Sequence, residues 1–458
     1  MIDNIRFTEL LRKYDVPVPR YTSYPTVPFW DTGKFSTEHW FAAIERSFAE
    51  SNSKKGISIY IHLPFCESLC TGCTGNTRIA RNHTVEYHYI EALRREWDIY
   101  KKIFGSVPAI RKIHLGGGGT PTFFSAPNLE RLIDIILKDA VVHDEHEFSF
   151  EGHPNYSTYE HIKALYDLGF SSVSYSVQDL DEKVQKKINI FQPFSKLKEV
   201  TDESRSIGYK SINFDLICAL PFQTTATVSD TMHKVLSLKP DRVSLYSCTH
   251  ISCVGPWQRG DEAVGLPTNA KKRKLYETGR VLLKAHGYED VGMDHFSLPT
   301  DKLFKAALRR TLHRNFMGYT TTPTDLLIGL GASAVSDAKY AYAQNRKTVE
   351  AYLNDIANDR LAISTGHVLT QRDMLIGRCI LDVACAGNIH CKSLEQFRDA
   401  DVMTSLYKMQ EEGMLTANID GFHVTELGRA FVHNICAVFD ERMNSEKKKE
   451  SKLFSQAN

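Results

Sequence analysis

The middle of this 458-residue chain alternates short strand-like runs with helical runs. Residues 57–62, ISIYIH, alternate side chains as a strand does, and residues 85–104 have helical spacing. Further strands are expected at 112–115, 147–154, 171–179, 211–221 and 242–250, with helical segments in between. About six such alternations predict an α/β fold with a parallel sheet and right-handed crossovers, open or curled into a partial barrel.

Chemically distinctive residues follow or close these strands. They are Cys66, the glycines of residues 116–119, Glu151, Gln178, Asp215 and His250. In parallel α/β folds the functional site lies at the carboxyl ends of the strands. The sequence therefore predicts one site built from these residues.

Two flanking regions differ from this pattern. We expect residues 1–50 to form an N-terminal arm around VPVPRYTSYPT, residues 51–365 the barrel with an extension, and residues 366–458 a C-terminal domain. The last region has helical segments and a hairpin that turns at Asp420-Gly421, so it resembles a winged helix. A formal net charge of +1 argues against nucleic-acid binding, and we interpret this region as a packing domain.

No stretch of the sequence is long and apolar enough to span a bilayer, and the N-terminus has no apolar run with a cleavage site. The sequence thus predicts a cytoplasmic protein without a membrane partner, and we take a monomer as the default. Thiols stay reduced in that compartment, so ten cysteines do not indicate a disulfide framework. Seven of them are scattered and are expected to be ordinary core residues.

The other three cysteines, Cys66, Cys70 and Cys73, form the motif C-x3-C-x2-C. A structural zinc site normally has four ligands, usually in two pairs, and a redox C-x-x-C pair would leave Cys66 unexplained. A four-iron cluster held by three thiolates keeps one iron free for a small molecule. We therefore favour a 4Fe-4S cluster with an open iron.

This cysteine motif after the first strand resembles that of the radical S-adenosylmethionine (SAM) enzymes. The run GGGGTPT of residues 116–122 stands where that family places its SAM-binding glycines. The resemblance implies a partial (β/α)6 barrel, a 4Fe-4S cluster on Cys66, Cys70 and Cys73, and SAM bound at the open iron.

Within that family, the chain resembles the oxygen-independent coproporphyrinogen III oxidases over nearly its whole length. The matching motifs are PRYTSYPT, IHLPFC, SVQD, DLICALP, GMDHF, LHRNF with GYTT, IGLGASAVS and YAQN. The resemblance implies that two propionates of coproporphyrinogen III lose CO2 and become vinyl groups, giving protoporphyrinogen IX. It also implies a tetrapyrrole substrate and an electron-donor protein such as flavodoxin or ferredoxin.

The resemblance further implies eight SAM contacts. Tyr60, Gly118, Glu151 and Val335 match positions around the cluster-bound SAM, and Gly119, Thr120, Gln178 and Asp215 match positions around a second SAM. One or two SAM molecules are therefore expected. Glu151 and Asp215 have suitable chemistry, because carboxylates accept hydrogen bonds from the amine and the ribose hydroxyls of SAM.

The chain departs from the family pattern at several places, namely Gly72, Gly75, Ile190, Met317 and Ala219. Two alternatives therefore stay open: a radical SAM paralogue that acts on haem or another porphyrin by methyl transfer or ring opening, and a haem-binding or trafficking protein without catalysis. Arg309, Arg310 and Arg314 could pair with substrate propionates or form a solvated basic face. No catalytic side chain is assigned.

Overall fold

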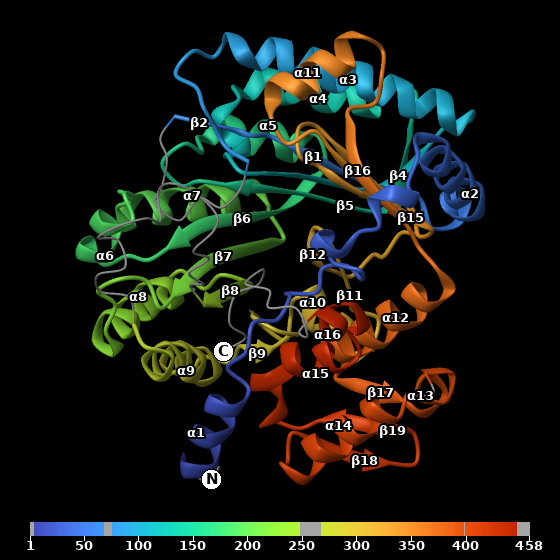
Figure 1. Cartoon of the computed structure of the whole chain (residues 1–458). Helices are drawn as coiled ribbons and strands as arrows, with labels where there is room; N and C mark the ends of the chain where they lie inside the picture. The colour runs from blue at the N-terminus through green and yellow to red at the C-terminus, as the bar shows by residue number, and fades with distance from the viewer. Residues whose placement is uncertain (1–3, 68–75, 248–266, 398, 447–458) are drawn as a thin grey trace.

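The computed structural model describes residues 4–67, 76–247, 267–397 and 399–446, and a twelve-stranded sheet dominates it (Figure 1). In spatial order its strands are β16 (Ile363–Val368), β15 (Ala341–Asn345), β14 (Val335–Asp337), β13 (Leu327–Leu330), β1 (Ile57–His62), β4 (Ala109–Gly116), β5 (Val141–Gly152), β6 (Phe170–Gln178), β7 (Ser211–Cys218), β8 (Arg242–Ser247), β10 (His295–Ser297) and β9 (Glu289–Asp290). Six neighbours, from β1 to β8, run parallel. The predicted α/β partial barrel is confirmed.

Helices join these parallel strands and cover the outer face of the sheet (Figure 1). They are α3 (Thr84–Phe104), α4 (Ala126–Leu137), α5 (Tyr159–Asp167), α6 (Glu182–Lys187), α7 (Phe194–Ile207) and α8 (Thr225–Ser237). On α4, Leu129, Leu132, Ile133 and Ile136 are fully buried, which is the spacing of one helix face.

Alternation along the strands separates an apolar outer face from a polar interior. On β5, Phe148 and Phe150 belong to the core shared with the helices. Glu147, Ser149 and Glu151 point to the other side, where they line cavities. Because side chains alternate on a strand, one sequence builds both the packed shell and a polar interior.

The N-terminal region contains two helices, α1 (Asn4–Lys13) and α2 (Thr37–Lys55). Neither helix was predicted from the sequence, from which we expected only an arm over residues 1–50. On α2, Trp40, Ile44 and Phe48 are buried in the barrel core, and the helix runs past residue 50.

The C-terminal region is mainly helical, as predicted, with a three-stranded sheet. Its elements are α12 (Gln371–Ala386), β17 (Asn388–His390), α13 (Cys391–Phe397), α14 (Ala400–Glu411), β18 (Leu415–Asn418), β19 (Gly421–Val424), α15 (Val432–Val438) and α16 (Glu441–Glu446). The predicted hairpin is confirmed by the pairing of β18 with β19. The helical run before this hairpin is divided into α13 and α14, and Asp399 caps α14 by accepting from the amides of residues 401 and 402.

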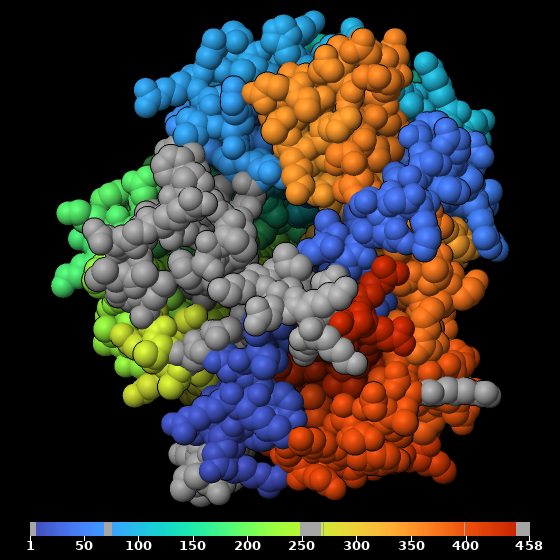
Figure 2. Space-filling model, in the orientation of Figure 1, coloured from blue at the N-terminus to red at the C-terminus, as the bar shows by residue number. Residues whose placement is uncertain are grey.

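The N-terminal segment packs on the C-terminal region. Leu10, Tyr21 and Tyr24 share a core cluster with Ile380 and Phe431. Figure 2 shows the blue N-terminal segment lying against the red C-terminal one. Among the described residues, no helix is both long enough and apolar enough to cross a membrane.

Candidate active site

Cys66 closes a short strand, β2 (Phe65–Cys66), at the carboxyl end of the barrel. This strand pairs with β3 (Arg78–Ile79), and the amide of Ala80 donates to the Cys66 carbonyl at 3.0 Å. The ends of the cysteine segment are thus fixed to each other. Cys70 and Cys73 lie outside the described residues. Cys66 is half-buried, and it lines a cavity of about 870 Å³.

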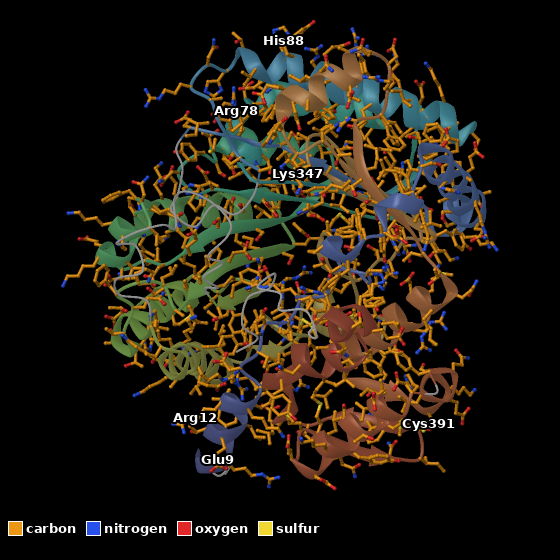
Figure 3. The ribbon with its side chains drawn as sticks, viewed as in Figure 1. Glu9, Arg12, Arg78, His88, Lys347 and Cys391 are labelled. Carbon is orange, nitrogen blue, oxygen red and sulfur yellow. The ribbon has the colours of Figure 1, made fainter. Side chains whose placement is uncertain are left out.

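Arg78 anchors this strand pair to the outer helices. Its guanidinium lies 2.9 Å from Glu350 of α11 (Val349–Ala357). Figure 3 shows Arg78 in the barrel half, whereas Cys391 lies far from it in the C-terminal region. Cys391 therefore belongs to none of the cysteine chemistry around Cys66.

The glycine loop after β4 packs directly on the backbone of the cysteine segment. A Cβ atom on Gly119 would lie 2.0 Å from the Phe65 carbonyl oxygen, and one on Gly117 would lie 2.8 Å from the Leu63 carbonyl oxygen. The hydroxyl of Thr77 donates to the Gly118 carbonyl at 2.6 Å. The glycines are needed here because two backbones meet without room for a side chain.

Aromatic and imidazole rings line the β1 side of the cavity. The Tyr60 hydroxyl lies 3.0 Å from Nδ1 of His62, and the Tyr60 ring stacks on His114 at 6.0 Å. Burial, and then the charge of Glu151, raises the pKa of Tyr60, so this hydroxyl stays protonated. Nε2 of His62 lies 3.3 Å from the hydroxyl of Ser333.

Two carboxylates face the cavity from β5 and β7. Glu151 is half-exposed, and its oxygens lie 3.3 Å from the Gly117 amide and 3.5 Å from Nε2 of His114. Asp215 accepts from the hydroxyl of Ser174 at 2.6 Å. Burial raises the pKa of Asp215, the Ser174 hydrogen bond opposes that effect, and the charge of Glu151 adds to it. Both acids are ready to accept hydrogen bonds from a ligand.

Seven of the eight predicted SAM contacts line this one cavity together with Cys66. They are Tyr60, Gly118, Gly119, Thr120, Glu151, Gln178 and Asp215. Gln178 ends β6 with a positive φ of 59°, which turns its side chain at the cavity wall. The eighth, Val335, is half-buried on β14 and is not among the described lining residues. The cavity lining therefore fits a cluster with SAM: the Cys66 thiol can bind iron, the glycines leave room, and the two acids can bind the polar groups of SAM.

Three lining residues, His153, Tyr156 and Tyr246, were not predicted from the sequence, and neither was His114, which contacts Tyr60 and Glu151. Burial lowers the pKa of His153 to about 4, so that ring is neutral near pH 7. His114 and Tyr246 lie within the strands, at positions whose alternation places them inside the barrel. That alternation is the signal that could have found them.

The departures from the family pattern occupy different environments. Ile190 packs in an apolar cluster with Val184, Ile188 and Leu220 at the cavity edge. Met317 lies in the turn between β11 (His313–Asn315) and β12 (Gly318–Thr320). Gly72 and Gly75 lie outside the described residues.

Comparison with known families and proteins agrees with this geometry. The Radical SAM superfamily matches residues 60–235. The oxygen-independent coproporphyrinogen III oxidase of Synechocystis is 33% identical, covering 98% of this chain and 97% of its own length. The protein of the same name from Pseudomonas aeruginosa is 32% identical, with 97% and 98% covered.

One solved structure is similar over almost the whole chain. It is coproporphyrinogen III oxidase from Escherichia coli, described as a radical SAM enzyme, with a TM-score of 0.87 and 30% identity. The similarity covers 94% of this chain and 98% of that structure. The similarity therefore extends well beyond the barrel.

Proposed function

Since the chain belongs to the family of oxygen-independent coproporphyrinogen III oxidases, which are radical SAM proteins, we propose that it decarboxylates coproporphyrinogen III oxidatively to protoporphyrinogen IX. The reaction is a step of porphyrin synthesis. It converts two propionate side chains into vinyl groups, with loss of two molecules of CO2.

The observation that carries the proposal is the position of Cys66. Its half-buried side chain lines a polar cavity that Glu151 and Asp215 also line, beside the glycine loop. We assign the cluster to Cys66 together with Cys70 and Cys73. When bound, the cluster and SAM supply the one-electron chemistry that removes a hydrogen atom from a propionate.

The chain's own residues bind SAM and orient it. Glu151 and Asp215 accept hydrogen bonds from the ammonium group and the hydroxyls of SAM, and Tyr60 offers a ring face. Gln178 and Thr120 add neutral polar groups to the cavity wall. The packed contact of Gly119 with Phe65 holds the cysteine segment against this wall, which limits access of water.

The partners of the reaction follow from its electron balance. Each decarboxylation would take one electron from a reductant by way of the cluster, to cleave SAM, and would release one electron from the substrate to a separate electron acceptor. A small electron-transfer protein such as flavodoxin or ferredoxin is the donor we propose, acting on a monomer.

The test is anaerobic reconstitution with iron and sulfide, followed by incubation with SAM, a reductant and coproporphyrinogen III. We expect 5′-deoxyadenosine and a tetrapyrrole that has lost two CO2. Cys66→Ala should abolish both products, whereas Cys391→Ala, at the distant cysteine, should leave them unchanged. Deoxyadenosine with an unaltered tetrapyrrole would refute the proposed substrate, and haem would then be tested as an alternative.

A further inference from the structure

The cavity beside Cys66 suits a cationic ligand far better than an anionic one. Its described lining includes Glu151 and Asp215 but no lysine or arginine. The proposed substrate carries propionate carboxylates, which these acids repel. Its carboxylates therefore need positive groups beyond this lining.

Arg314 is a buried cation near that place. It lies on β11 directly opposite Tyr319 of β12, and its guanidinium carbon is 4.7 Å from the centre of the Tyr319 ring. Only 9% of the residue is exposed, and its Nε atom has no hydrogen-bond partner among the described residues. Within the described part of the chain, no carboxylate pairs with Arg314. An unpaired buried charge is costly, so a ligand that pairs with it gains affinity.

His295 supplies a second unpaired polar atom in the same cluster. Its ring lies 5.1 Å from Tyr319, edge-on, and its buried Nδ1 meets no hydrogen-bond partner in the part of the chain that the structure describes. Burial, and then the charge of Arg314, lowers the pKa of His295 to about 3. The ring is therefore neutral at physiological pH, and one nitrogen carries a hydrogen that a carboxylate can accept.

Tyr246 connects this cluster to the cavity. Tyr246 lines the cavity, and its ring lies 5.9 Å from that of His295. Arg20 of the N-terminal segment is exposed above the same Tyr246 ring, at 5.8 Å, and adds a second positive charge. Asp294 is the acid whose charge reaches His295 and opposes the effect of Arg314 there.

We propose that Arg314 and His295 form a carboxylate-binding subsite that holds one propionate of the tetrapyrrole while the rest of it reaches the cavity past Tyr246. The identity of the tetrapyrrole rests on the proposed function. The proposal distinguishes Arg314 from its neighbours Arg309 and Arg310, which are exposed. The subsite positions substrate and takes no part in the chemistry.

The test measures binding and does not depend on turnover. Coproporphyrin III, the fluorescent oxidised form, is titrated into the reconstituted protein, and its dissociation constant is compared with that of Arg314→Gln. Charge-assisted hydrogen bonds imply a loss of about 10- to 100-fold. The uncharged tetramethyl ester should bind both proteins equally. Arg309→Gln, an exposed arginine of the same segment, is the matched control and should bind like the unaltered protein.

Two further variants guard against a folding defect. Arg314→Lys keeps the buried charge without the planar fork, and we expect about 10-fold weaker binding. His295→Phe keeps a ring and loses the donor, and should weaken carboxylate binding by a few-fold. The iron and sulfide content of both variants after reconstitution should match that of the unaltered protein, which would show that they fold.

The outcomes separate the two proposals. Equal affinity for coproporphyrin III in Arg314→Gln and the unaltered protein would overturn the subsite even if decarboxylation occurs. An equal loss of affinity for the ester would overturn it as well, because the effect would then not depend on charge. If Arg314→Gln binds coproporphyrin III more weakly but the unaltered protein shows no decarboxylation, the subsite would be supported and only the proposed reaction would be refuted.

Discussion

Replacing Gly119 by alanine should disconnect the glycine loop from the cysteine segment. The added Cβ would lie 2.0 Å from the Phe65 carbonyl oxygen, and this separation must grow to at least 3.0 Å. Both sides of the contact are backbone, so no side chain can move away. The hydrogen bond from the Thr120 amide to the same oxygen, at 3.2 Å, is lost in the process. Overpacking costs about 1–3 kcal/mol and a lost hydrogen bond about 1 kcal/mol, so we expect a loss of roughly 2–4 kcal/mol.

The assay combines urea denaturation under anaerobic conditions with iron and sulfide content after reconstitution. Gly119→Ala should lower both stability and cluster loading, because Phe65 immediately precedes Cys66. The control is Gly377→Ala in α12, whose Cβ would meet Tyr24 at an ordinary 3.7 Å. That change should stabilise the protein by about 0.5–1 kcal/mol through helix propensity. Normal cluster loading in Gly119→Ala, with a stability loss under about 0.5 kcal/mol, would refute the reasoning.

Three further predictions concern buried charges. Burial raises the pKa of Glu96 to about 7, although the hydrogen bond from the Gly331 amide opposes this effect. The free energy of unfolding should therefore fall as the pH rises from about 4.5 through 7. Urea titrations at several pH values should show this fall, and Glu96→Gln should remove it. Burial opposes ionisation of Asp373, but hydrogen bonds from His367 and Thr370 hold its pKa well below the usual range. The contribution of ionised Asp373 to the free energy of unfolding should therefore be present at neutral pH and lost in acid. At pH 7, Asp373→Asn should lower the free energy of unfolding by about 2–3 kcal/mol. Burial lowers the pKa of Lys112 to about 8. Above that pH the unfolded chain binds the proton more tightly than the folded one, so the free energy of unfolding should rise between about pH 8 and 10. Lys112→Met should abolish this rise.

The sequence predicted the barrel because its strands and helices carry local periodicity. Helix α2 also carries such a signal, since Ser36 precedes it as a cap and Trp40, Ile44 and Phe48 recur every four residues. It was missed because what stabilises it is packing on β15 and β16, which follow about 300 residues later in the chain. The break between α13 and α14 has a local cause, Asp399, which the helical spacing concealed.

The site was predicted in part for the same reason. The ends of parallel strands meet, so Glu151, Gln178 and Asp215 could be grouped from sequence before any contact was known. The role of the glycines was understood less well. They were expected to admit a ligand, whereas Gly119 admits the backbone of Phe65, a contact between segments about 50 residues apart. Spacing alone does not reveal which partner a glycine approaches.

Three arginines in one segment show where sequence reasoning stops. Arg309 and Arg310 follow the short helix α10 (Lys302–Leu308) and remain exposed, whereas Arg314 sits within the β11–β12 hairpin opposite Tyr319. Composition and charge make the three equivalent. The hairpin separates them, because its pairing fixes which side chain faces the interior. A basic cluster is therefore informative about binding only after burial has shown which of its members places an unsatisfied donor in the interior.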